Sequence, residues 1–190
     1  MMTSQPPGVD PERADLLSAL ARHRGFLTKT LDGLTHGQAA ARPTASELCL
    51  GGLIKHVGNT ERQWIAFAVQ GQEAFGPPID WSAVDWTDLE ANPGVAEMFA
   101  QRTQEFALLP EETVQGVLAD YAAVAADTER IVRDLPDLAA SNELPSAPWF
   151  EPGSSWSVRR VLLHVIAETS QHAGHADILR ESIDGAKTMG

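Results

Sequence analysis

The sequence is poor in cysteine and has no long apolar run. Cys49 is the only cysteine among 190 residues, so a disulfide within the chain is excluded, which is typical of proteins from a reducing cytosol. The apolar runs fall far short of the roughly 18 residues that a membrane-spanning helix needs. Residues 1–11 are polar and contain proline, without the apolar segment of a signal peptide. We therefore expect a cytoplasmic protein that does not enter a membrane.

Positive charge is also scarce. The chain has 14 Lys and Arg residues against 26 Asp and Glu residues, which gives a formal net charge of -12. Such a chain repels phosphate backbones and has no basic cluster to offset the repulsion, so nucleic acid is not an expected partner. Hydrophobic residues make up 43% of the chain, which suffices for a core without disulfides. The length fits one domain over residues 1–190, of which we expect residues 1–9 to be flexible.

Apolar residues recur at helical spacing in four long segments. These segments lie at about residues 11–33, 50–70, 110–135 and 155–183. Ser155 and Ser157 are both candidate N-caps of the last helix, and Gly185 ends it. Residues 71–94 and 136–155 are rich in proline and contain tryptophan, which is typical of long loops, and no convincing strand is present. The pattern predicts an all-α fold, a four-helix bundle with long crossover loops.

The last predicted helix concentrates side chains that can bind metal ions. Residues 164–175 hold three of the six histidines in the chain, together with Glu168. Glu168 and His172 are four residues apart, so they project one turn apart from the same face. At 3.6 residues per turn both lie toward the apolar face, whereas His164 and His175 lie toward its flanks. Glu168 and His172 are therefore the residues best aimed at the bundle interior.

A carboxylate in an apolar interior is costly unless it is paired, protonated or bound to a metal. The nearest basic residues on the same helix lie about two or more turns from Glu168. A metal ion would satisfy Glu168 and His172 together. His56 is the only histidine of the second predicted helix and is the natural third ligand. Three protein ligands would leave one position open, as in catalytic metal sites.

Other interpretations of these residues stay open at this point. A single histidine on an apolar face is more often a hydrogen-bonded core residue than a ligand. A Glu–His pair at this spacing also occurs by chance on charged helix faces. His164 and His175 could ligate directly, contact a ligand from outside, or face water. Spacing alone therefore supports a hypothesis and does not assign the ligands.

Three stretches of the sequence resemble the DinB-like superfamily of metal-binding four-helix bundles. Residues 162–181 (LLHVIAETSQHAGHADILRE) resemble its C-terminal helix motif, and residues 48–57 (LCLGGLIKHV) resemble its second-helix motif. Residues 155–159 (SWSVR) resemble the start of its last helix. The matches follow the right order over most of the chain. They are most similar to an actinobacterial branch, and the chain is also similar to the N-terminal domains of mycothiol-dependent maleylpyruvate isomerases.

The resemblance implies a specific metal site. In the superfamily one ligand is a histidine of the second helix, and two ligands separated by three residues come from the last helix. This implies the set His56, Glu168 and His172, with Glu-x-x-x-His in place of the commoner His-x-x-x-His. The maleylpyruvate isomerases carry the glutamate form. Two imidazoles and a carboxylate suit zinc with an exchangeable fourth position, with nickel as the alternative, and His164 and His175 are then expected outside the ligand set.

The resemblance also implies chemistry, because several relatives use mycothiol or bacillithiol as cosubstrate. A zinc ion stabilises the thiolate of such a low-molecular-weight thiol, which can then attack a small electrophile. The first hypothesis is therefore a metal-dependent thiol transferase or isomerase. The alternative is a metal-binding stress-response or interaction protein without catalysis. The alanine-rich residues 122–126 would allow close helix packing, either inside the bundle or in a homodimer.

The tryptophans of the two predicted loops have two interpretations. Trp81, Trp86 and Trp149 would either help to wall a pocket or only pack the loops onto the bundle. Long loops in a compact domain often have a function such as covering a site.

Overall fold

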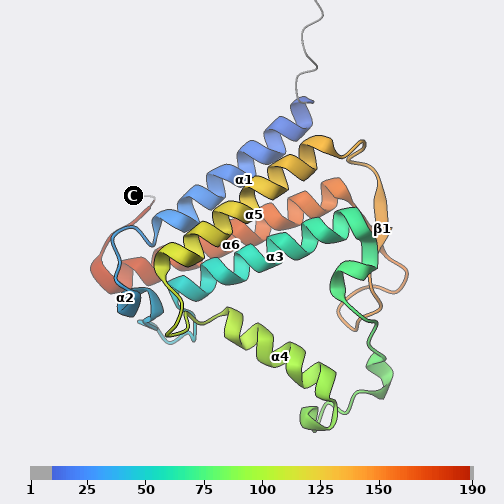
Figure 1. Cartoon of the computed structure of the whole chain (residues 1–190), viewed down its shortest axis with the longest axis horizontal. Coiled ribbons are helices and arrows are strands. Elements are labelled where there is room, and N and C mark those ends of the chain that lie inside the picture. Colours follow the sequence, from blue (N-terminus) through green and yellow to red (C-terminus); the bar gives the residue numbers. More distant parts are fainter. Residues whose placement is uncertain (1–9, 189–190) are drawn as a thin grey trace, which may run out of the picture.

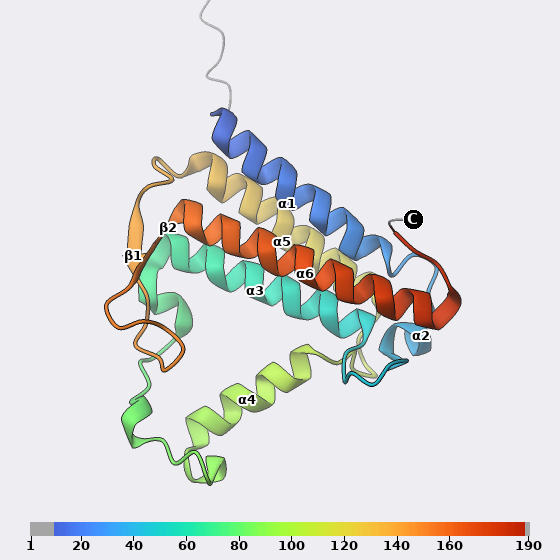
Figure 2. The same ribbon diagram turned by 180° about the vertical axis from the view of Figure 1, so that it is seen from behind.

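The computed structural model describes residues 10–188, in which four long helices pack side by side (Figures 1 and 2). They are α1 (Pro11–Lys29), α3 (Leu50–Gln70), α5 (Val114–Asp134) and α6 (Val158–Asp184). Both α5 and α6 contact α1 and α3, so the four helices surround one core. The predicted all-α four-helix bundle is confirmed. The expectation that residues 1–9 are flexible lies outside the described residues.

One long crossover connects the end of α3 to the start of α5. Figures 1 and 2 show that α3 and α5 run in the same direction, opposite to α1 and α6. The chain must therefore return along the bundle between α3 and α5. It does so through three 3-10 turns, η1 (Gly71–Phe75), η2 (Trp81–Ala83) and η3 (Leu89–Ala91), followed by α4 (Pro93–Glu105). A short α2 (His36–Ala40), which begins with a capping box at Thr35, precedes α3.

The C-terminal end of α4 is fastened to the first turns of α3. Lys55 donates hydrogen bonds to the carbonyl oxygens of Gln104 and Ala107, with Nζ–O distances of 3.3 and 2.9 Å. A side chain at Gly52 would collide with the carbonyl group of Phe106, so only glycine permits this close approach. The rest of α4 stands apart from the four-helix bundle (Figures 1 and 2). This attachment brings the end of α4 against the face of α3 that carries His56.

The sequence pattern assigns no helix to residues 93–105, and that omission is wrong. Among its residues α4 buries only Val95. A helix with so little buried surface has no apolar stripe from which periodicity could reveal it. The third long helix also begins at Val114, with the Thr113 hydroxyl accepting from the Gly116 amide, rather than near Pro110.

The absence of strands is the second expectation that is wrong. Strands β1 (Ser141–Glu143) and β2 (Ser155–Ser157) form an antiparallel pair within the predicted second loop. Asn142 pairs with Trp156 in this ladder, and the Asn142 amide also donates to the carbonyl oxygens of Phe67 and Ala68 at the end of α3. The pair therefore holds Trp156 against the bundle just before α6, which starts at the predicted cap Ser157.

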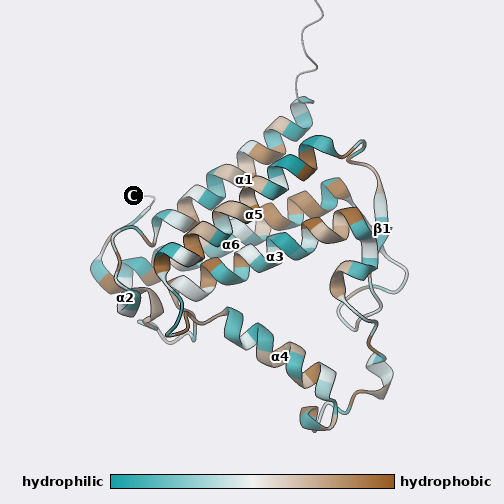
Figure 3. Ribbon diagram, in the orientation of Figure 1, coloured by the Kyte–Doolittle hydropathy of each residue, from teal (hydrophilic) through white to brown (hydrophobic). Residues whose placement is uncertain are grey.

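The core combines apolar packing with one buried ion pair. Each long helix carries hydrophobic and hydrophilic residues (Figure 3), as helices that bury one face do. In the centre, Arg24 of α1 donates through Nε to Glu61 of α3 over 3.0 Å, and the Thr128 hydroxyl of α5 donates to the same carboxylate. Arg24 and Glu61 are 6% and 1% exposed, so they carry charge in the interior. Among the described residues, no helix is both long and apolar enough to cross a membrane.

Candidate metal centre

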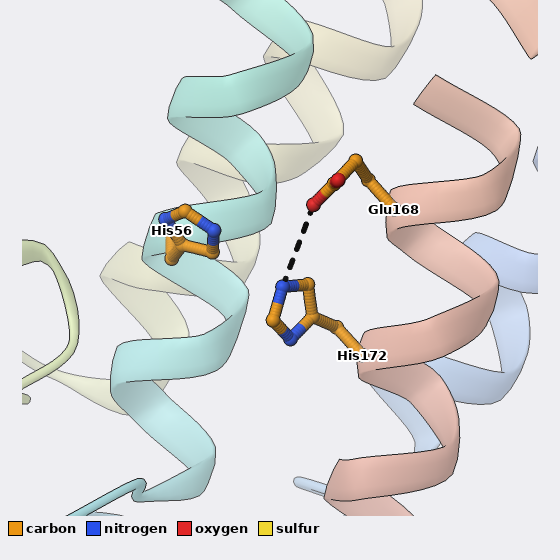
Figure 4. A group of neighbouring side chains, drawn as sticks. All are labelled: His56, Glu168 and His172. Atoms are coloured by element: carbon orange, nitrogen blue, oxygen red, sulfur yellow. Dashed lines mark ion pairs between the residues drawn. The ribbon is translucent and has the colours of Figure 1, made fainter. Parts of the chain in front are cut away.

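The structure brings His56, Glu168 and His172 together between α3 and α6 (Figure 4). One potential ligand atom from each residue lies within 4.8 Å of the other two. His172 Nε2 and the Glu168 carboxylate are 3.6 Å apart, and the His56 and His172 rings are 5.0 Å apart between centroids. Figure 4 shows one nitrogen of His56 turned toward the two α6 side chains. We call these three residues the triad.

His56 is held in one orientation by residues of α3 and α4. Its Nδ1 atom lies 3.4 Å from Glu105 Oε2, and the Asn59 amide donates to the other oxygen of Glu105 over 3.2 Å. A carboxylate can only accept, so the hydrogen bond places the proton of neutral His56 on Nδ1. The lone pair on Nε2 is then left for the triad. Phe106 stacks on the imidazole with ring centroids 4.1 Å apart, which restricts its rotation.

Glu105 is negatively charged, as an acceptor for the Nδ1–H group of His56 should be. Burial alone would raise the pKa of Glu105, but the hydrogen bond from His56, assisted by Asn59 and Arg102, outweighs burial and holds the pKa below its usual value. Glu105 is therefore ionised at neutral pH. A carboxylate behind a histidine increases the basicity of the imidazole toward a metal and fixes its tautomer.

His172 is kept neutral by its surroundings. Burial is the largest cause that lowers the pKa of His172, to about 4. A neutral imidazole is the form that binds metals. His172 Nε2 faces Glu168, while Nδ1 lies 3.5 Å from Nδ1 of His175. His175 therefore contacts the back of His172, and it does not enter the triad.

His164 also lies outside the triad. Its Nε2 is 3.9 Å from Glu168 Oε1, and its ring packs edge-on against Trp64 and Trp156 with centroids 4.8 and 5.0 Å apart. Burial lowers the pKa of His164, so this imidazole is also kept neutral. His164 and His175 each lie next to one member of the triad, and a supporting role for either in metal binding stays a prediction.

The chemistry of the triad fits a divalent metal ion. Two imidazoles and one carboxylate are a common ligand set for zinc when a fourth position is left to water or substrate. Small side-chain movements would bring the three donor atoms to bonding distance. Among residues 10–188, this is the one group of three or more His, Cys, Asp or Glu residues placed closely enough for a metal. The alternative for His56, an ordinary core histidine, explains its contact with Glu105 but not the convergence of Glu168 and His172.

Sequence reasoning missed Glu105 and Phe106. Both lie at the end of α4, in a segment for which the sequence predicted no structure, and they reach His56 only through the tertiary crossover. Asn59 gave a weak signal, since it lies three residues after His56 and therefore on the same face of α3.

Comparisons with known proteins agree with the fold and show the family. A family model described as "MST: Mycothiol-S-transferase" matches residues 15–185. A search of curated proteins gave no match. A solved structure, "Crystal structure of the conserved protein of locus from Enterococcus faecalis", superposes with a TM-score of 0.59 and 17% sequence identity, covering 91% of this chain and 97% of that chain. At this identity the similarity supports the fold alone.

Proposed function

This chain belongs to the mycothiol-S-transferase family. We propose that it is a metal-dependent transferase that joins the sulfur of mycothiol to a small electrophile. The proposal rests on one observation, the convergence of two imidazoles and a carboxylate from α3 and α6. His56, Glu168 and His172 would hold the metal, for which zinc is the first candidate and nickel the second. A divalent ion with an exchangeable position lowers the pKa of a bound thiol, so that the nucleophilic thiolate exists at neutral pH.

The triad and the residues around it are in the protonation states that metal binding requires. Glu105 fixes the Nδ1–H tautomer of His56 and leaves Nε2 as a donor atom. The low pKa of His172 keeps its ring neutral over the physiological pH range. Glu168 supplies one negative charge, which partly offsets the charge of a divalent ion and so moderates its acidity. The half-buried position of the triad limits competing water.

The proposed reaction needs no oxidant or reductant. The thiol loses its proton, a carbon–sulfur bond forms, and the electrophile either expels a leaving group or takes up a proton at the neighbouring carbon. If the electrophile carries a cis double bond, reversal after rotation gives isomerisation. The same set of residues would serve both outcomes, so the choice depends on the electrophile.

Metal content tests the first half of the proposal. The purified protein should contain close to one zinc per chain by elemental analysis after loosely bound metal is removed. His56→Ala, Glu168→Ala and His172→Ala should each lose most of it, whereas His36→Ala, at an exposed histidine of α2, should not. Wild-type zinc content in all three triad variants would refute the site.

Thiol binding tests the second half. Calorimetry should show that mycothiol binds the zinc-loaded protein much more tightly than the Glu168→Ala variant. Turnover should follow when alkyl halides, epoxides and conjugated carbonyl compounds are supplied. A zinc-loaded protein that binds none of mycothiol, bacillithiol, glutathione and cysteine would instead support the non-catalytic metal-binding alternative.

A further inference from the structure

All five tryptophans of the chain lie in one connected set of ring contacts, although they come from three separate segments. The contacts, given as distances between ring centroids, join Trp86 to Trp81 (5.8 Å), Trp81 to Trp149 (4.8 Å), Trp149 to Phe150 (6.2 Å), Phe150 to Trp156 (6.3 Å) and Trp156 to Trp64 (4.6 Å). We call these six residues the tryptophan wall. Its members belong to α3, the crossover and the segment around β2.

The outer part of the wall is exposed. Trp86 and Trp149 are 51% and 57% exposed, and they are among the most exposed large hydrophobic residues of the described chain. Packing the loops onto the bundle would require only the inner rings, because a half-exposed tryptophan gives up much of the stability that burial supplies. Adjoining exposed aromatic rings instead mark a surface that binds something.

The inner end of the wall is joined to the triad through His164. Trp64 and Trp156 stack in parallel, and the His164 ring lies edge-on to both. His164 in turn is 3.9 Å from Glu168. The wall is therefore linked to the proposed ligand Glu168 through His164 and extends away from it.

The extent of the wall decides which substrate it fits. The Arg160 guanidinium lies 4.4 Å from the centre of the Trp156 ring. Arg160 is eight residues before Glu168, which corresponds to about 12 Å along α6. Reacting atoms must approach within about 3.5 Å of each other, so a small electrophile stays close to the sulfur. A group that reaches the wall must belong to the longer cosubstrate. In mycothiol that group is the glucosamine–inositol unit that carries the cysteinyl thiol.

We propose that the tryptophan wall binds the glucosamine–inositol part of mycothiol while its sulfur lies at the triad. This inference rests on the proposed function. The flat faces of such rings present C–H groups, which carry slight positive charge and pack against the negative face of an aromatic ring. Arg160 is exposed, and its guanidinium lies over the Trp156 ring. From there its N–H groups can donate to the hydroxyl groups of the sugar.

Binding measurements on two thiols separate the wall from the metal centre. In zinc-loaded protein, Trp149→Ala and Trp86→Ala should each weaken mycothiol binding about tenfold, the loss of one ring contact. Binding of N-acetylcysteine, which carries the thiol without the sugar, should not change. Trp149→Phe should retain most of the mycothiol affinity. Ile178→Ala removes another exposed apolar side chain, 60% exposed on α6, and should alter neither thiol.

A second measurement needs no metal and no turnover. Thiol-free glucosaminyl-inositol, titrated into metal-free protein, should change the tryptophan fluorescence, and Trp149→Ala should weaken that response. Circular dichroism and zinc content would verify that each variant is folded. If the zinc-loaded protein binds no thiol, the proposed function fails, and the sugar titration still tests the wall. An unchanged fluorescence signal, or an equal loss of affinity for both thiols, would overturn the assignment of the wall to the sugar.

Discussion

Glu105 offers the sharpest test of how the fold supports the metal centre. Glu105→Gln keeps the size of the side chain but replaces an ionised acceptor of the His56 Nδ1–H with a neutral one. A hydrogen bond to a charged group contributes about 1 kcal/mol more than a neutral one. The Nδ1–Oε2 distance is long, at 3.4 Å, and the Glu105 side chain is 29% exposed. We therefore predict a loss in zinc affinity of about tenfold, the lower end of the range for residues behind metal ligands.

The same change has a calculable effect on stability. Zinc at 100 times its dissociation constant stabilises the native state by about 2.7 kcal/mol. A tenfold weaker site at the same zinc concentration retains about 1.4 kcal/mol. Glu105→Gln should thus lower the zinc-dependent part of the unfolding free energy by about half, while the metal-free proteins should differ little.

Competition with a chelating indicator gives the dissociation constant, and urea unfolding with and without zinc gives the stability. Glu97→Gln is the matched control, since Glu97 is exposed on the same helix and points no hydrogen bond at the triad. The reasoning is refuted if Glu105→Gln binds zinc as tightly as wild type. It is equally refuted if Glu97→Gln weakens zinc binding to the same degree.

Three further predictions concern the bundle and its protonation. Glu61→Gln leaves the buried charge of Arg24 unpaired and should cost about 3–5 kcal/mol in urea unfolding; a loss below 1 kcal/mol would contradict this. Because the folded pKa of His172, about 4, lies below its reference value of 6.5, the unfolded state binds more protons between these values. Stability of the metal-free protein should therefore fall as pH drops through this window, by up to about 1.4 kcal/mol per pH unit, and the slope should be smaller in His172→Gln. Gly52→Ala should displace the end of α4 and weaken zinc binding as well as stability, whereas Gly25→Ala, which meets no atom within 4 Å, should leave zinc affinity unchanged in the chelator assay.

The parts of the site that the sequence predicts are those governed by local periodicity. Glu168 and His172 lie one turn apart on α6, and helix geometry alone directs them to one side of the bundle. His56 follows because it is the one histidine on the buried face of α3. These inferences need no knowledge of loops, since the positions of ligands on long amphipathic helices are set by residues that are close in sequence.

The parts that the sequence does not predict depend on contacts between distant segments. Glu105 is 49 residues from His56, and α4 buries too little surface to show an apolar stripe. Strands β1 and β2 are three residues long, too short for alternation to be visible. The Asn142 side chain of β1 also donates to carbonyl oxygens at the end of α3, more than 70 residues earlier in the chain. Such contacts form only when the bundle has assembled, and the local conformational preferences of the sequence do not reveal them.

The crossover between α3 and α5 contributes residues both to the metal centre and to the tryptophan wall. Because α3 and α5 are parallel, the chain between them must run the length of the bundle, and glycine at position 52 lets its end come close to α3. That approach places Glu105 behind His56 at one end, while the start of the crossover carries Trp81 and Trp86 into the tryptophan wall. One connection thus supplies both the residue that orients a proposed ligand and the rings proposed to bind the cosubstrate. Changes at Trp81 or Trp86 should therefore lower mycothiol affinity without changing metal affinity, whereas changes at Glu105 should lower metal affinity first.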